Sequence, residues 1–304
     1  MTNDMIDRFA AQVSRLRRPE GIADIVLDTD TFNEIDDQFA LSYMVLSPEK
    51  LRVRGICAAP FLNDNSNGPA DGMEKSYNEI LKLLGLLGRN DLIPMVHRGS
   101  ERFLSSETEP VDSDAARALV ELSRSYTEDN PLYIASIGAI TNVASALLLD
   151  PTMAKRVYII WLGGHGFDFG NTAEFNLMQD VAAGRVVLRS GAPVVLFPAM
   201  GTTSHLQVSE PELETALRGR NSLCDYLLEN TVSYMHRWNI RHWHKVIWDI
   251  AAIGWFIDET FQRERIIHAP IPQYDHHFSE DGDGVFLRYV YYLDADRILD
   301  SLFS

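Results

Sequence analysis

The sequence is poor in cysteine: Cys57 and Cys224 are the only two among 304 residues. Two cysteines cannot build the disulfide framework of a small secreted domain, so we expect a reducing, cytoplasmic location. Cys57 lies inside an apolar run, where a cysteine is more often a buried core residue than a nucleophile. The scarcity of cysteine therefore predicts a fold that rests on its hydrophobic core.

Long apolar runs are also missing, and none approaches the about 18 residues that a membrane-spanning helix needs. The N-terminal segment places Phe9, Val13 and Leu16 at helical spacing and ends at Pro19. It lacks the continuous apolar core of a signal peptide. We therefore expect a surface helix packed on the domain, and no membrane partner.

Positive charge is in short supply. The 27 lysines and arginines are outnumbered by 43 aspartates and glutamates, which gives a net charge of −16. A surface of this sign repels phosphate backbones, so nucleic acid is a poor partner. The chain also lacks internal repeats and linkers rich in proline, glycine or serine. We therefore expect one domain over residues 1–304.

Apolar runs alternate with helical patterns along the first two thirds of the chain. The expected strands are 25–27, 53–58, 93–96, 132–136, 157–162 and 194–197. The expected helices between them are 37–46, 73–87, 114–126, 142–149 and 181–189. This alternation predicts an α/β fold, with a mainly parallel open sheet and helices on both faces.

Beyond Pro198 the pattern changes. Helices are expected at 211–217, 222–238, 246–257 and 294–303, and strands at 266–268 and 285–293.

Four aspartates follow the first expected strand: Asp28, Asp30, Asp36 and Asp37. In open α/β sheets the ligand crevice lies outside the carboxyl ends of the strands. Asp36 could instead cap the next helix, with its neighbours stabilised by the helix dipole. That explains one or two of the four, because packed carboxylates repel unless a cation or a shared proton neutralises them. The cluster favours a hard cation that prefers oxygen ligands, such as calcium or magnesium.

Residues 135–144 read as a strand, a glycine turn and the start of a helix. Backbone groups near Thr141 should therefore face the same crevice. In the alternative interpretation, Thr141 or Asn142 is simply the N-cap of that helix.

Glu174 and Asn176 follow a pair of glycines, Gly163 and Gly164, that would let the backbone approach a ligand. In an extended segment, residues two apart lie on one face. A carboxylate beside an amide suits sugar hydroxyls, which both donate and accept. A solvated loop explains the pair equally well.

Trp248 and Asp249 open an apolar segment, where an aspartate is usually a helix cap. His242 and His244 precede them at a spacing that could bind a transition metal. The acidic residues nearby favour a hard cation instead.

Together these stretches resemble the inosine-uridine-preferring nucleoside hydrolase family. Residues 28–30 and 35–37 match the two ends of the family's Asp-x-Asp-Pro-Gly-x-Asp-Asp-Ala. Residues 138–144 are similar to its Gly-Pro-Leu-Thr-Asn-Leu-Ala, and residues 173–176 match its Ala-Glu-Phe-Asn. The matches are colinear and extend from Ile25 to about Ile257.

The resemblance implies a calcium-dependent enzyme with that family's α/β fold. The implied calcium ligands are Asp30, Asp37, Asp249 and the backbone oxygen of Thr141. Asp30 would also take a proton from the calcium-bound water. The residues implied to bind the ribose hydroxyls are Asp36, Glu174, Asn176 and Asp249.

The chain departs from the family pattern at several positions. Thr31 and Phe32 replace Pro-Gly, and Asn33-Glu34 reads as a two-residue insertion. The family's strand-2 asparagine has no clean counterpart, and Asn63 is the candidate for its role in substrate binding.

Trp248 stands where many members have the histidine implicated in protonating the leaving base. We name His244 as a catalytic candidate for that step, with His242 and Trp248 as alternatives, and Trp248 as a substrate contact.

The implied reaction is hydrolysis of the N-glycosidic bond of a ribonucleoside, which releases base and ribose for purine or pyrimidine salvage. We expect a small-molecule nucleoside as substrate and a homo-oligomer, either dimer or tetramer. Because Trp248 replaces the family histidine, a non-catalytic nucleoside- or ribose-binding relative is an alternative. A haloacid-dehalogenase-type phosphatase also begins with a strand and Asp-x-Asp. That pattern wants threonine or valine where this chain has Phe32.

Overall fold

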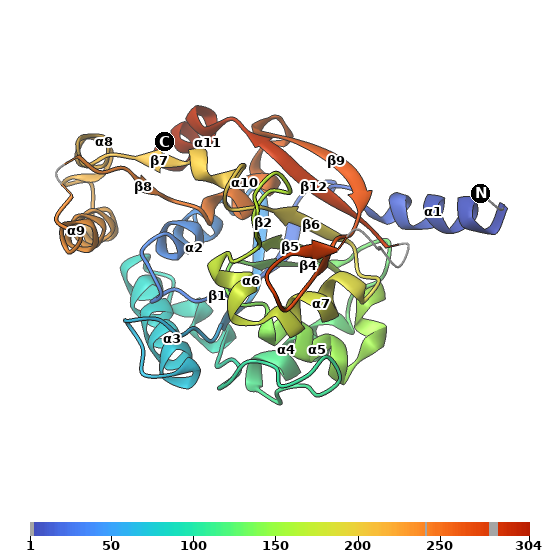
Figure 1. Ribbon diagram of the computed structural model, residues 1–304. Coiled ribbons are helices and arrows are strands. Elements are labelled where there is room, and N and C mark those ends of the chain that lie inside the picture. The colour runs from blue at the N-terminus through green and yellow to red at the C-terminus, as the bar shows by residue number, and fades with distance from the viewer. Residues whose placement is uncertain (1–2, 241, 280–284) are drawn as a thin grey trace.

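An eight-stranded sheet runs through the computed structural model, which describes residues 3–240, 242–279 and 285–304 (Figure 1). The strand order is β3-β2-β1-β4-β5-β6-β12-β9. Neighbouring strands pair in parallel except β9, which is antiparallel to β12. The mainly parallel sheet predicted from the sequence is therefore confirmed. The strands are β1 (Ala23–Thr29), β2 (Leu51–Ala58), β3 (Val96–His97), β4 (Leu132–Ser136), β5 (Val157–Leu162), β6 (Val194–Phe197), β9 (Gln262–His268) and β12 (Phe286–Leu293).

Helices cover both faces of this sheet, as predicted. Successive residues of a strand point to opposite faces. Ile25 and Leu27 accordingly lie in one buried apolar cluster, and Val26 lies in the other. The first cluster is closed by α2 (Asp37–Val45), α3 (Pro69–Leu86), α9 (Ser222–His236), α10 (Ile250–Ile257) and α11 (Ala295–Phe303). The second is closed by α4 (Asp114–Ser123), α5 (Thr141–Leu149) and α7 (Val181–Arg189).

The remaining elements are short or peripheral. They are α1 (Asn3–Arg15), α6 (Phe175–Gln179), α8 (Glu210–Leu217), β7 (Gln207–Val208), β8 (Lys245–Val246), β10 (Ile271–Pro272), β11 (Phe278–Ser279) and the 3-10 helices η1 (Asn90–Met95), η2 (Pro151–Lys155), η3 (Thr203–His205) and η4 (Glu259–Phe261).

The strand order reverses at β1, where β2 lies on one side and β4 on the other. The helices after β1 and β4 leave on opposite faces, so a crevice opens between the two strand ends. Asp28 and Ser136 are partners in the register of this pair, and the Ser136 hydroxyl donates to the Asp28 carboxylate at 2.9 Å. The aspartates that follow β1 therefore begin at the point where such sheets bind ligands.

Two predicted elements are wrong. Residues 93–96 were expected to form a strand, but η1 occupies most of that stretch and β3 keeps only two residues. Pro94 explains this, because proline has no N–H to donate to a strand neighbour.

The helix expected over 246–257 begins only at Ile250. Lys245 and Val246 pair instead with β7, and the amide of Ile247 donates to the carbonyl of Leu206 at 2.7 Å.

The N-terminal segment forms the expected helix, α1, which extends away from the body of the molecule (Figure 1). Its described contacts come from its second half. The ring of Phe9 packs edge-on against Phe286 with centroids 4.7 Å apart, and Arg15 donates to the carbonyls of Ala154 and Gly191. No helix in the described part of the chain combines the length and the apolar character needed to cross a bilayer.

Gly99, just after β3, allows a close backbone approach at the carboxyl end of β2. A Cβ built on it would lie 1.8 Å from the carbonyl oxygen of Ala58 and 2.6 Å from the amide nitrogen of Asn142. That Asn142 amide donates to the same carbonyl at 3.1 Å and to Asp28 at 2.8 Å. Position 99 therefore has room for glycine alone, because any side chain there would clash with the backbone at the base of the crevice.

We predict that Gly99→Ala lowers the free energy of unfolding by about 1–3 kcal/mol, the usual range for overpacking a filled site. Gly85→Ala is the matched control, because a Cβ there meets nothing within 4 Å and Gly85 lies inside α3. It should stabilise the protein by about 0.5–1 kcal/mol, since alanine favours a helix interior. Urea denaturation measures both, and equal stabilities for the two variants would contradict the proposed packing.

Candidate functional site

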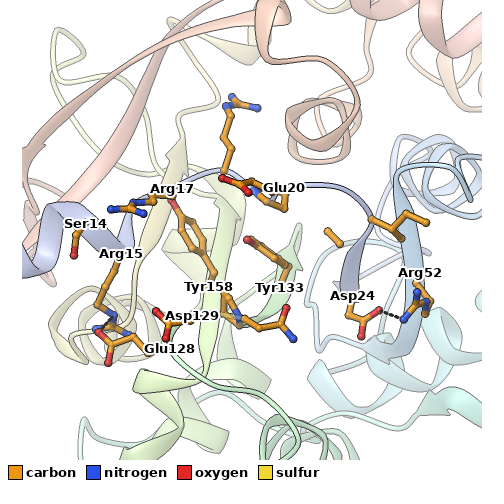
Figure 2. Close-up of a pocket in the computed structure, with 16 residues that line it drawn as sticks. Ser14, Arg15, Arg17, Glu20, Asp24, Arg52, Glu128, Asp129, Tyr133 and Tyr158 are labelled. Carbon is orange, nitrogen blue, oxygen red and sulfur yellow. Dashed lines mark ion pairs between the residues drawn. The ribbon is translucent and has the colours of Figure 1, made fainter.

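Cavities open at both ends of the parallel strands. One of about 640 Å³ lies at their amino ends, lined by residues such as Asp24, Tyr133 and Tyr158 (Figure 2). Two ion pairs lie in its lining: Arg52 is 3.3 Å from Asp24, and Arg15 is 3.0 Å from Glu128. The residues singled out in the sequence lie at the other end of the sheet.

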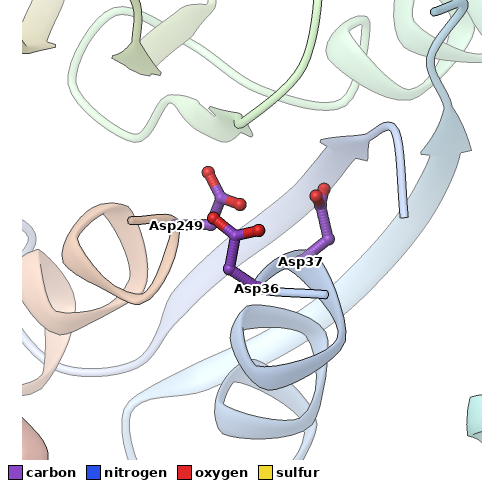
Figure 3. Close-up of side chains that lie close together, drawn as sticks. All are labelled: Asp36, Asp37 and Asp249. Carbon is purple, nitrogen blue, oxygen red and sulfur yellow. The ribbon is translucent and has the colours of Figure 1, made fainter. Parts of the chain in front are cut away.

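Three aspartates meet at the carboxyl ends of the strands. Asp36 and Asp37 come from the start of α2 and Asp249 from the start of α10, and their carboxylates gather in one small space (Figure 3). One oxygen from each lies within 4.8 Å of the others, and none of the side chains is more than 4% exposed. Residues 212 positions apart in the chain thus form one acidic group.

The local backbone explains why these carboxylates are free to meet. Asp36 and Asp249 each stand immediately before a helix, yet both have helical backbone angles and neither side chain makes a capping hydrogen bond. The interpretation of Asp36 as a side-chain cap is therefore wrong, and the same holds for Asp249. The positive ends of two helix dipoles point at the acidic group and stabilise it.

Asp30 lies beside this group, with its side chain 1% exposed. Neither carboxylate oxygen accepts a hydrogen bond from any residue that the structure describes. Burial, followed by the charges of Asp37 and Asp36, raises the pKa of Asp30 well above its usual range. Buried polar atoms are nearly always paired, so two orphaned oxygens on one carboxylate indicate a missing proton or cation.

Asp37 and Asp249 show the same electrostatic strain. Burial, and then the charge of Asp36, raises the pKa of Asp37 to about 8, although a hydrogen bond from the Thr29 hydroxyl opposes this rise. The pKa of Asp249 is also raised well above its usual value, first by burial and then by Asp36 and Asp37. Burial and mutual repulsion therefore favour the protonated forms of Asp37 and Asp249 when no cation is bound.

Lys245 supplies a positive charge next to the acidic group, and the sequence analysis missed it. Its ammonium, 6% exposed, pairs with Glu34 and lies 3.5 Å from a carboxylate oxygen of Asp36. Burial lowers the pKa of Lys245, but the charges of Asp36 and Glu34 more than compensate and raise it above its usual value. The sequence carried no signal for this residue, because a lysine is usually exposed. In the structure Trp243, Lys245 and Ile247 are all buried, at the spacing of two that a strand produces.

A cavity of about 230 Å³ opens above the carboxylates and brings most of the predicted site together. Its lining includes the predicted residues Asp36, Asp37, Glu174, Asn176, Trp248 and Asp249. It also includes His165 and Met200, which the sequence analysis did not assign. The Met200 amide donates to His165 at 3.4 Å, and burial lowers the pKa of His165. The paired glycines before His165 marked this turn, but not the direction of its side chain.

Glu174 and Asn176 line the cavity by a different route from the one expected. Asn176 lies in α6, and Glu174 caps that helix, so the pair does not belong to one extended segment. Glu174 accepts from the amides of Gly164, Asn176 and Leu177 at 2.8, 2.9 and 3.0 Å. Burial nevertheless raises the pKa of Glu174 to about 7. The side-chain amide of Asn176 donates to the carbonyls of Ile137 and Leu162, which ties the ends of β4 and β5 together.

Thr141 and Asn142 are not N-caps, since Ile140 occupies that position. The Thr141 hydroxyl donates to Asp180 at 2.6 Å, and a role for its carbonyl oxygen as a metal ligand stays a prediction. Asn142 accepts from both the amide and the hydroxyl of Ser100, in addition to its bonds to Asp28 and Ala58. The two residues hold the loops around the crevice together.

Asn63, His242 and His244 are not among the described residues that line the cavity. Asn63 donates to the side chain of Asn33, a lining residue, at 2.6 Å. Both histidines are exposed. The substrate role of Asn63 and the acid role of His244 stay predictions.

Comparisons with known proteins agree with this geometry. A family model described as inosine-uridine preferring nucleoside hydrolase matches residues 25–277. The pyrimidine-specific ribonucleoside hydrolase RihA of Salmonella paratyphi A is 27% identical over 258 residues, which cover 77% of this chain and 79% of that protein.

Two solved structures share the fold. A plant nucleoside hydrolase, the PpNRh1 enzyme, superposes with a TM-score of 0.74 and 20% identity, and covers 92% of this chain and 97% of its own. The purine-preferring ribonucleoside hydrolase from Gardnerella vaginalis gives a TM-score of 0.72 and 19% identity, with coverages of 92% and 96%. The family model spans most of the sequence, from the strand that precedes the aspartates to beyond Asp249. The chain therefore belongs to the inosine-uridine preferring nucleoside hydrolase family and is a nucleoside hydrolase.

Proposed function

We propose that this protein binds calcium at its aspartate group and hydrolyses the N-glycosidic bond of a ribonucleoside, releasing base and ribose. The observation that carries the proposal is the buried Asp30 carboxylate, both of whose oxygens lack a hydrogen-bond partner among the described residues. A buried carboxylate without a hydrogen-bond donor, next to two others with raised pKa values, would be stabilised by a bound cation.

The donor set supports calcium. The proposed ligands are Asp30, Asp37, Asp249 and the carbonyl oxygen of Thr141, all of them hard oxygen donors. The group of potential ligands found in the described chain holds three aspartates and no histidine or cysteine, which argues against a soft transition metal. A calcium ion bound here would lower the pKa of a coordinated water and position it for attack.

Different residues of the chain are proposed to have separate roles in the reaction. Asp30 is the proposed base, because it is buried beside the cation site, and burial raises its pKa above that of an ordinary aspartate. Asp36, Glu174, Asn176 and Asp249 are proposed to hold the ribose hydroxyls. Cleavage of a glycosidic bond passes through an oxocarbenium-like state. Hydroxyl contacts that strengthen as the ring flattens bind that state more tightly than the substrate.

The leaving base must be protonated or stacked as it departs. Trp248 lines the cavity and is half-buried, which suits a stacking partner for a planar base. His165 lines the same cavity, and burial favours its neutral form. His165 joins His244 as a candidate acid by its position in the cavity, although its lowered pKa disfavours the protonated form that would donate to the base. The relatives are described as pyrimidine-specific and purine-preferring, so the proposal covers ribonucleosides of either kind.

We place the reaction in cytoplasmic nucleobase salvage, in a homo-oligomer. The scarcity of cysteine and the net charge of −16 support a reducing compartment and a small-molecule partner in place of nucleic acid. The family assignment excludes the haloacid-dehalogenase-type phosphatase. A non-catalytic nucleoside-binding relative is the remaining alternative, motivated by Trp248 in the family's histidine position. Turnover that scales with enzyme concentration separates the two.

We predict that protein purified without chelator carries about one calcium ion per chain. Asp37→Ala should lose most of it, because that carboxylate is a proposed ligand. Asp91→Ala should keep it, because Asp91 lies on the surface and pairs with Arg89 at 2.8 Å, outside the acidic group. Elemental analysis of the three proteins measures this, and zinc in the wild type, or no metal after calcium is added, contradicts the site.

Stability should depend on pH in an unusual direction when calcium is removed. Asp28, Asp37 and Glu174 have pKa values of about 7, 8 and 7 in the folded protein, against ordinary values of 3.8, 3.8 and 4.5. Between these limits the folded chain holds protons that the unfolded chain has released. Stability is therefore lost as the pH rises from about 5 to about 8.

The melting temperature in excess chelator should accordingly fall from pH 5 to pH 8. Saturating calcium should flatten this slope, because it binds and stabilises the ionised carboxylates. A melting temperature that is constant or rises across this range in chelator would rule out the predicted protonation.

We predict that Asp30→Asn lowers kcat by at least about 100-fold, within the range that a general base contributes. Asparagine keeps an oxygen for the cation but accepts no proton from the attacking water. His244→Ala and Trp248→Phe should each cost less, because several groups can assist the leaving base. Assays use saturating calcium and one nucleoside with a poor leaving group, with circular dichroism as a folding control. Retention of more than about a tenth of wild-type turnover by Asp30→Asn would remove it as the base.

A further inference from the structure

Asp36 stands between two roles in this site. Its carboxylate lies close enough to Asp37 and Asp249 to share a cation with them. The proposed function instead assigns Asp36 to binding the ribose and includes Asp30 among the metal ligands. Nothing in the spacing of the aspartates decides between these roles, so the deciding contact must come from outside the acidic group.

Lys245 makes that contact. It lies on β8, which is held in place by pairing with β7 and by the hydrogen bond of the next residue, Ile247, to Leu206. Its ammonium lies 3.5 Å from the oxygen Oδ1 of Asp36, and both side chains are nearly buried. An isolated buried ammonium is unfavourable, whereas one paired with carboxylates is retained and is costly to unpair.

Glu34 and Tyr234 complete the surroundings of this ammonium. Glu34 pairs with Lys245 directly, and the ring of Tyr234 lies 5.8 Å from the ammonium, at the edge of cation–π range. Glu34 belongs to the Asn33-Glu34 insertion. The carbonyl of Asn33 accepts from Asn65 at 2.8 Å, so the inserted residues are anchored on both sides. The insertion thus supplies the second carboxylate that fixes the lysine head.

We propose that Lys245 is a positioning residue that reserves Asp36 for the ribose and keeps it out of the calcium ligand set. The ammonium attracts the Asp36 carboxylate away from the cation, and Glu34 holds the ammonium in place. The positive charge of Lys245 also weakens the binding of calcium nearby, because like charges repel. Loss of the lysine should therefore have opposite effects on the two ligands: tighter calcium and weaker nucleoside.

The test rests on the proposed function and compares three variants with the wild type. Lys245→Met removes the charge and keeps the length, and Lys245→Arg keeps the charge. Lys82→Met is the matched control, because Lys82 also lies over a tyrosine ring, at 3.9 Å from Tyr226, whose hydroxyl donates to Glu79 and not to an aspartate of the acidic group. Each protein is measured by calcium calorimetry, steady-state kinetics, thermal melting and crystallography.

In Lys245→Met we expect the calcium Kd to fall at least about threefold, because one nearby positive charge is gone. kcat/KM for the nucleoside should fall at least about tenfold, through both a higher KM and a lower kcat, because the proposed Asp36 contact is present with the substrate and strengthens in the transition state. Lys245→Arg should recover most of both values, and Lys82→Met should match the wild type.

A purely structural role gives a different result. If Lys245→Met weakens calcium binding and activity together, in parallel with a lower melting temperature, and arginine does not rescue them, the proposal is overturned. If the wild type neither binds calcium nor cleaves nucleosides, the proposed function has failed, and the crystal structures decide the role of Lys245. An Asp36 carboxylate that turns away from position 245 in Lys245→Met supports the positioning role, and an unmoved one overturns it.

Discussion

Repulsion among buried carboxylates is the constraint on which the rest of this site depends. Asp30, Asp36, Asp37 and Asp249 are each 4% exposed or less. Water cannot screen them, and each raises the free energy of ionising its neighbours. The fold counters this repulsion with two helix N-termini, one lysine and a threonine hydroxyl, and these leave Asp30 without a donor. A bound ligand must neutralise the negative charge that these groups leave uncompensated.

Such strain persists only where the surrounding backbone cannot relax. Side-chain amides and carboxylates bind the loops beyond the parallel strands to one another: Asn142 connects β1 to β2, Asn176 connects β4 to β5, and Asp180 joins α7 to Leu104 and Thr141. These hydrogen bonds are mostly buried. They make the crevice a rigid frame, so the acidic group cannot spread apart to relieve its own repulsion.

The sequence predicted the parts of the molecule that depend on local pattern. The strand ends and the order of the aspartate, glycine and glutamate-asparagine motifs follow from residues close together in the chain. The reversal of the strand order at β1 depends on pairing between distant segments, so only the structure reveals it. Lys245 and His165 were missed because their roles depend on contacts with residues far away. Glu34 is 211 positions from Lys245, and Met200 is 35 from His165. The apolar residues from Val246 onward predicted a helix, whereas in the structure Lys245 and Val246 pair with β7.

The three hydrogen bonds from backbone amides to Glu174 limit how many further donors its carboxylate can accept. A carboxylate offers about four lone-pair positions, and the backbone already occupies three of them, two on one oxygen and one on the other. One acceptor position remains, at a fixed angle, on the oxygen that faces the Asn176 amide. On the proposed assignment, Glu174 can therefore recognise a single hydroxyl from a single direction. Selectivity between sugars that differ only in the configuration at one carbon would then arise from the backbone amides of Gly164, Asn176 and Leu177, acting through one side chain.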